Sequence, residues 1–141
     1  MKTVHILLVE DNEGDILLTQ EAFEESKFNI QISVARNGQE ALDFLHQTGA
    51  FTQAKVPDLI LLDINIPIFN GHEVLARIKQ HEELKKIPVI MLTTSSNKKD
   101  IQRAYENHTN SYITKPVDMN EFLEAIQKIE DYWIQLSKRA T

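Results

Sequence analysis

The sequence predicts a doubly wound α/β domain, in which a five-stranded parallel sheet is covered by helices on both faces. Five short apolar stretches rich in β-branched residues recur along the chain, and each is followed by a segment of helical periodicity. Such alternation is typical of βαβ units. All four prolines and all four glycines stand between the apolar stretches, where turns and helix caps need them.

The predicted strands differ in their expected burial. Stretches 4–9, 59–62 and 89–93 are nearly continuous in apolar residues, which suits strands buried on both faces of a parallel sheet. Stretch 30–35 alternates apolar and polar residues and is therefore expected at the sheet edge. The fifth predicted strand is 112–114.

A helical pattern follows each predicted strand. The first helix is expected over 15–25. Asn37 and Glu40 look like a helix cap with an acid three residues on, and Gly49 is expected to end this second helix. The apolar positions that mark the helices are Leu18, Ala22 and Phe23; Leu42 and Leu45; Val74, Leu75 and Ile78; Ile101, Ala104 and Tyr105; Phe122, Ile126, Ile129, Trp133 and Leu136.

Length and composition restrict the class of protein. The 141 residues suit one domain, expected to span 1–141 with no output domain. The chain has 15 Lys plus Arg against 21 Asp plus Glu, and this acid excess argues against nucleic acid as a partner. No cysteine is present, which excludes disulfides and thiolate sites. Apolar runs are too short for a signal peptide or a membrane span, so a cytoplasmic protein is expected.

Residues suited to chemistry follow the predicted strands at their carboxyl ends. Glu10 and Asp11 follow the first strand, and Asp63 follows the third. Thr93 ends the fourth strand, and Lys115 follows the fifth. Because ligands of open α/β sheets bind at this edge, these side chains are expected to form one site.

The residue types indicate phosphoryl transfer assisted by a divalent cation. Three clustered carboxylates repel one another, and Mg²⁺, which prefers oxygen ligands, relieves that repulsion. Asp63 is a plausible nucleophile, because a carboxylate needs no general base for that role. Lys115 supplies a mobile positive charge, and Thr93 supplies a hydrogen-bond donor to a phosphoryl oxygen.

Each residue taken alone has a simpler interpretation. Glu10 or Asp11 is often only a helix N-cap, and an Asp before a turn, such as Asp63, is often only a turn residue. Thr93 alone suits a strand, and Lys115 alone suits a solvated surface. Their combination at successive strand ends favours a site.

Four segments match a known family. They are Leu-Leu-Val-Glu-Asp-Asn at 7–12; Pro-Asp-Leu-Ile-Leu-Leu-Asp-Ile-Asn-Ile-Pro at 57–67 with Asn-Gly at 70–71; Val-Ile-Met-Leu-Thr-Thr at 89–94; and Tyr-Ile-Thr-Lys-Pro at 112–116. Through them the chain resembles the receiver domain of bacterial two-component response regulators over essentially its whole length. The resemblance implies a flavodoxin-like, CheY-like fold with strand order 2-1-3-4-5.

The resemblance also implies a role for each acidic residue. Asp63 would be the phosphoacceptor, taking its phosphoryl group from a histidine of a sensor kinase. Glu10 and Asp11 would hold Mg²⁺ together with Asp63 and the backbone carbonyl of Asn65. Glu10 stands where relatives also frequently have Asp, which leaves the metal hypothesis intact.

Further roles are implied near the fourth and fifth strands. Thr93 and Lys115 would engage the phosphoryl group, and Tyr112 would be an aromatic switch that moves inward with Thr93. The family usually has a cis peptide before the proline that matches Pro116. Ser111 stands where many relatives have Gly or Ala.

Partners are implied more narrowly. Segment 88–133 looks similar to the small regulators that partner bacterial phytochromes, so the sensor histidine kinase is expected to be of phytochrome type. Output is expected through a surface made by the fourth helix, fifth strand and fifth helix, and a homodimer is expected through the same face. The apolar overhang of Tyr132, Trp133 and Leu136 supports that dimer, whereas a single core-facing stripe is the simpler interpretation.

Two other functions are disfavoured. A phosphohydrolase with an aspartyl-phosphate intermediate usually has an Asp-x-Asp pair after its first strand and a cap domain, but Asn65 is the second neighbour of Asp63. A pseudo-receiver that only binds partners normally loses acidic, acceptor or lysine residues that this chain keeps. The five histidines show no spacing typical of metal ligands.

Overall fold

The computed structural model describes residues 3–24, 29–93, 111–114 and 131. In this part of the chain, five strands form one sheet in the order β2-β1-β3-β4-β5, with every neighbouring pair parallel. The strands are β1 (Thr3–Val9), β2 (Asn29–Ala35), β3 (Leu59–Leu62), β4 (Val89–Thr93) and β5 (Ser111–Thr114). The predicted parallel sheet and its strand order are therefore confirmed.

In the described ranges, three α-helices and two 3₁₀ helices lie between these strands. They are α1 (Glu13–Glu24), α2 (Gly38–His46), η1 (Gly49–Phe51), α3 (Gly71–Gln80) and η2 (Leu84–Lys86). The predicted fourth and fifth helices lie outside the described residues. None of the helices in the described ranges is long and apolar enough to cross a membrane.

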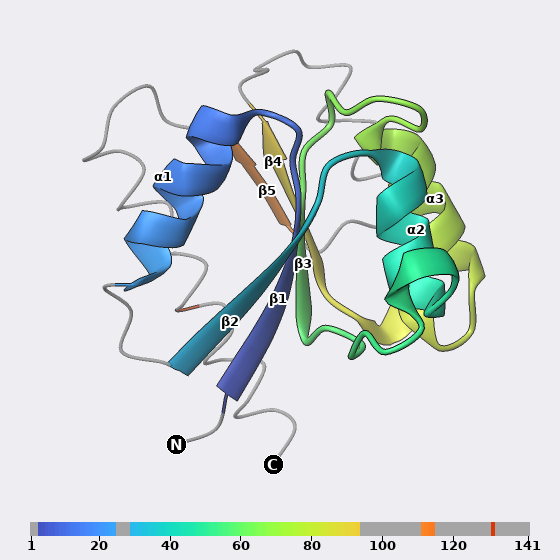
Figure 1. Ribbon diagram of the computed structural model, residues 1–141. Helices are drawn as coiled ribbons and strands as arrows, with labels where there is room; N and C mark the ends of the chain where they lie inside the picture. Colours follow the sequence, from blue (N-terminus) through green and yellow to red (C-terminus); the bar gives the residue numbers. More distant parts are fainter. Residues whose placement is uncertain (1–2, 25–28, 94–110, 115–130, 132–141) are drawn as a thin grey trace.

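The helices cover both faces of the sheet. Figure 1 shows α1 on one side and α2 with α3 on the other. Side chains alternate between the faces of a strand, so Ile6 and Leu8 of β1 pack in the cluster with Phe23 of α1. Leu7 and Val9 pack in the opposite cluster with residues of α2 and α3. Burial of both faces explains why β3 is wholly apolar and buried.

The edge strand follows a different pattern. β2 pairs only with β1 in the sheet order, and most of its residues are only partly buried. This position agrees with the alternating sequence of stretch 30–35, which predicted an edge strand.

The end of α2 differs from the prediction. Asn37 caps its start as expected, since the side-chain oxygen accepts a hydrogen bond from the Glu40 amide at 2.8 Å. Gly49 was expected to end the helix, but α2 ends at His46 and Gln47 takes the left-handed conformation with φ of 57°. Gly49 begins the next 3₁₀ helix instead. In this conformation the Gln47 amide donates to the carbonyls of Asp43 and Phe44, and its side chain donates to the Ala54 carbonyl at 2.6 Å.

Candidate functional site

The register of the sheet places the first two acidic segments side by side. Val9 of β1 lies opposite Leu62 of β3, so the next residues, Glu10 and Asp63, leave the sheet at the same level. The Asp63 amide donates to the Val9 carbonyl at 3.1 Å, which continues the pairing one residue beyond the strands. Parallel pairing therefore brings together two carboxylates that are 53 positions apart in the sequence.

An acidic cluster lies at this edge. Glu10, Asp11 and Asp63 each offer a carboxylate oxygen, and these three oxygens lie within 4.8 Å of one another. Glu10 and Asp63 are only 2% and 7% exposed, whereas Asp11 is exposed to solvent. Since such oxygens are hard ligands whose mutual repulsion a cation relieves, the cluster fits a divalent metal ion.

The simpler interpretations of these acids can now be compared with their contacts. α1 is capped by Asn12, whose side-chain oxygen accepts from the Asp15 amide at 3.0 Å. Glu10 instead accepts from the amides of Asp11 and Asn12 at 3.1 and 3.4 Å. Glu10 therefore holds the turn after β1 and does not cap α1.

Asp63 does form the turn contact that its sequence position suggested. Its Oδ1 accepts from the Asn65 amide at 3.1 Å. This bond fixes the direction of the carboxylate relative to the turn, and the same side chain belongs to the acidic cluster. The turn role and the site role are therefore compatible in Asp63.

Gly71 lies very close to the backbone of Asp63. A Cβ at Gly71 would lie 2.4 Å from the Asp63 carbonyl oxygen and 2.7 Å from the Ile64 Cα. The Gly71 amide donates to the Ile64 carbonyl at 2.8 Å, and Asn70 caps α3 by accepting from the Glu73 amide at 3.0 Å. The start of α3 is thus pressed against the chain that holds Asp63.

The other predicted site residues are placed only in part. Leu62 of β3 lies opposite Met91 of β4, so the backbone of Thr93 lies one residue beyond the level of Asp63 on the adjoining strand. Tyr112 lies on β5 opposite Met91. The side chains of Thr93 and Tyr112, and the whole of Lys115, lie outside the described residues, as do Pro116 and the overhang at 132–136.

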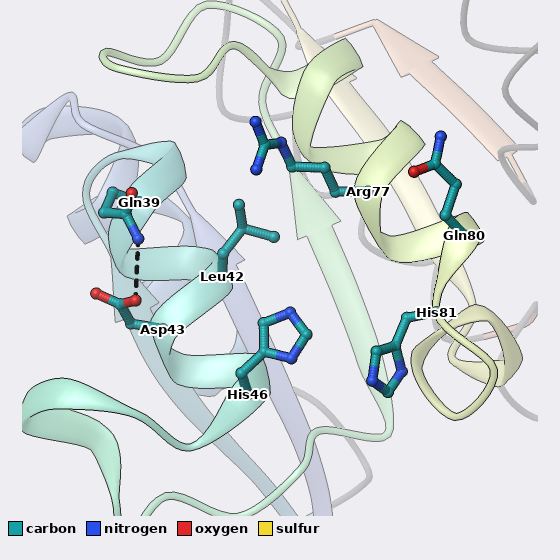
Figure 2. Close-up of a pocket in the computed structure, with 7 residues that line it drawn as sticks. All are labelled: Gln39, Leu42, Asp43, His46, Arg77, Gln80 and His81. Atoms are coloured by element: carbon teal, nitrogen blue, oxygen red, sulfur yellow. Dashed lines mark hydrogen bonds between the residues drawn. The ribbon is translucent and has the colours of Figure 1, made fainter.

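A pocket lies between α2 and α3 (Figure 2). The spacing of residues in the sequence did not indicate it. Its volume is about 400 Å³, and the rings of His46 and His81 approach each other across it with centroids 5.1 Å apart. The His81 Nδ1 accepts from the amides of Glu83 and Leu84 at 3.3 and 3.2 Å. Because Nδ1 accepts these two bonds, its lone pair is directed at the backbone and not at a metal ion.

Fold and site together define a class of protein. A parallel sheet in the order 2-1-3-4-5, with acids clustered where β1 and β3 end, is the arrangement of flavodoxin-like domains that work at the carboxyl edge of the sheet. The model of the response regulator receiver domain family matches residues 6–127. The chain belongs to this family.

Two response-regulator and regulatory proteins align with most of this chain. It is 43% identical to the response regulator Rcp1 of Synechocystis, over 92% of this chain and 88% of Rcp1. It is also 43% identical to the probable methanogenesis regulatory protein FilR2 of Methanothrix harundinacea, over 92% of this chain and 83% of FilR2.

Solved structures agree with the fold. The phosphorylated cyanobacterial phytochrome response regulator RcpA is 44% identical and superimposes with a TM-score of 0.89, over 94% of this chain and 95% of RcpA. The Mn²⁺-bound form of Rcp1 gives a TM-score of 0.87 at 43% identity, over 92% and 94% of the two chains.

Proposed function

We propose that this response regulator accepts a phosphoryl group on Asp63 from a phosphohistidine of a sensor kinase, in a Mg²⁺-dependent reaction. The acidic cluster at the carboxyl edge is the observation that best supports this role, because it joins a positioned carboxylate to a cation site. Phosphoryl acceptance is general for the family, and the relative RcpA has been solved in a phosphorylated form.

The metal would be held by Glu10, Asp11, Asp63 and the backbone carbonyl of Asn65. The Mn²⁺-bound structure of Rcp1 supports a divalent ion in this family. When bound, Mg²⁺ would neutralise charge on the carboxylates and on the phosphoryl oxygens. In the chain itself, the backbone amide of Asp11 holds the Glu10 carboxylate, and the backbone amide of Asn65 orients the Asp63 carboxylate.

The transfer step needs little beyond positioning. A carboxylate oxygen of Asp63 attacks phosphorus, and an O–P bond forms while the N–P bond of the phosphohistidine breaks. The donor ring, protonated on its other nitrogen, leaves with the electron pair of that bond as neutral imidazole. Lys115 and Thr93 are assigned to the phosphoryl oxygens, where they would balance charge in the transition state, and the same residues would support later hydrolysis of the acyl phosphate.

Output would follow from a change of surface. Phosphorylation would shift an equilibrium in which Thr93 and Tyr112 move inward together, altering the face made by the fourth helix, β5 and the fifth helix. The similarity to Rcp1 and RcpA over nearly their full lengths supports a response regulator of the same kind. It also supports a phytochrome-type kinase as donor. The homodimer expected through that face rests on the sequence alone, and light scattering with and without phosphorylation measures its mass.

The proposal is tested with a small phosphodonor. The protein is incubated with acetyl phosphate, with and without Mg²⁺, and its intact mass is measured. The parent should gain one phosphoryl group only with Mg²⁺, and Asp63→Asn should gain none. Asp58→Asn is the matched control, because Asp58 is an exposed aspartate at the opposite end of β3. Labelling that persists in Asp63→Asn would overturn the assignment.

A further inference from the structure

Ile68 has an unusual combination of backbone and exposure. Its φ is 71°, in the left-handed region that β-branched residues rarely adopt. Its side chain is 68% exposed, the largest value among the exposed large hydrophobic residues in the described part of the chain. Since the side chain lies largely in solvent, burial of apolar surface does not compensate for the strained backbone.

The neighbours of Ile68 explain how this conformation is held. The Pro67 carbonyl accepts from the Gly38 amide at 3.1 Å. A Cβ at Gly38 would lie 2.3 Å from the Phe69 carbonyl oxygen, so α2 packs directly on the backbone after Ile68. The Phe69 ring packs on the core beneath the Arg77 guanidinium, 4.2 Å from the ring centroid. Both sides of the loop are anchored, and Ile68 is turned outward between them.

Ile68 lies on the loop that begins at the acceptor and leads to α3. Gly71 lies against the Asp63 carbonyl and bonds to Ile64, which closes the loop at its base. Ile68 is three residues from Gly71, so their Cα atoms are at most about 11 Å apart. The loops after β1 and β3 leave the sheet at the same edge (Figure 1). Ile68 therefore lies on the rim of this edge of the sheet, the edge that carries the acidic cluster.

A protein donor must cover this rim. Asp63 is only 7% exposed, so a phosphohistidine has to enter the site while the surface around it rests on the surrounding loops. We propose that Ile68 is a docking residue for the phosphohistidine-bearing protein and contacts an apolar patch next to its histidine. This inference rests on the proposed function and names a residue that selects the donor. A small donor such as acetyl phosphate makes no such contact.

The test compares the two kinds of donor. Ile68→Asn keeps a residue that tolerates the left-handed conformation but is polar, whereas Ile68→Met keeps an apolar side chain without β-branching. Val56→Asn is the matched control, because Val56 is 48% exposed and precedes β3 at its opposite end. Each variant is labelled by acetyl phosphate and by the autophosphorylated sensor kinase that labels the parent fastest.

The expected result is a loss of at least about tenfold in kcat/KM for the kinase in Ile68→Asn, with an unchanged rate from acetyl phosphate. Ile68→Met and Val56→Asn should stay within about twofold of the parent with both donors. Equal kinase rates for Ile68→Asn and the parent would overturn the inference, as would equal losses with both donors. Unchanged transfer with loss of self-association would assign Ile68 to a second copy and also overturn it. Failure of the parent to accept phosphoryl from acetyl phosphate would instead overturn the proposed function.

Discussion

Replacing Gly71 by alanine should damage both the fold and the acceptor site. The added Cβ would lie 2.4 Å from the Asp63 carbonyl oxygen, 2.7 Å from the Ile64 Cα and 3.0 Å from the Asp63 carbonyl carbon. All three neighbours are backbone atoms, so no side-chain rotation relieves the contact. The start of α3 and the chain after β3 must move apart.

The size of the effect follows from these distances. Restoring an ordinary contact of 3.4 Å requires a movement of about 1 Å, since 3.4 − 2.4 = 1.0. Overpacking of this kind costs about 1–3 kcal/mol. The same movement stretches the 2.8 Å bond from the Gly71 amide to the Ile64 carbonyl, and its loss adds about 0.5–1.5 kcal/mol. Alanine restricts the unfolded chain and returns about 0.4–1 kcal/mol, so the expected net loss is about 1–4 kcal/mol.

Thermal unfolding and acetyl phosphate labelling measure the two consequences. Gly71→Ala should melt several degrees below the parent, and below its melting range it should label more slowly because the Asp63 backbone is displaced. Gly14→Ala is the control, since among the described residues its Cβ would meet only the Asn12 side chain, at 3.3 Å, and its stability should stay within about 1 kcal/mol of the parent. Equal melting and equal labelling rates for Gly71→Ala and the parent would refute the packing argument.

Three further predictions concern a cap, a partly buried histidine and the cluster. Asn70→Ala should lower the free energy of unfolding by about 0.5–2 kcal/mol, because the Glu73 amide loses its acceptor; a denaturant titration that matches the parent would contradict this. Burial lowers the pKa of His5 below its ordinary 6.5, so the unfolded chain binds more protons and stability should fall as pH drops through that value. Stability of His5→Gln should therefore fall less between about pH 7.5 and pH 5, and parallel curves would contradict the linkage. Asp11→Asn should weaken Mg²⁺ binding at least about tenfold by calorimetry, whereas Glu21→Gln, at an exposed acid on α1, should leave it unchanged; equal affinities of Asp11→Asn and the parent would contradict the proposed ligand set.

The sheet could be predicted closely because its signals are local. β3 and β4 have the predicted bounds, since short, mostly apolar runs between turn residues have few other structures open to them. The end of α2 could not be predicted, because the left-handed Gln47 makes a side-chain bond to Ala54, seven residues away. Sequence rules assign that conformation to glycine first, and Gly49 was therefore the wrong choice.

The candidate site also has features that the sequence predicts and features that it does not. The approach of Glu10, Asp11 and Asp63 could be predicted because the carboxyl ends of parallel strands meet at one edge. The strained backbone of Ile68 and the approach of His46 to His81 depend on how helices and loops pack together. No local sequence pattern encodes those contacts, so they emerge only from the folded chain.

The central claim is that Asp63 is the phosphoacceptor, and the most direct measurement locates the acyl phosphate on the chain. Borohydride reduces an aspartyl phosphate to homoserine, which peptide mass spectrometry assigns to a single position. After treatment with acetyl phosphate and Mg²⁺, homoserine is predicted at position 63 and at no other aspartate. Homoserine at position 11 with an unmodified Asp63 would contradict the account.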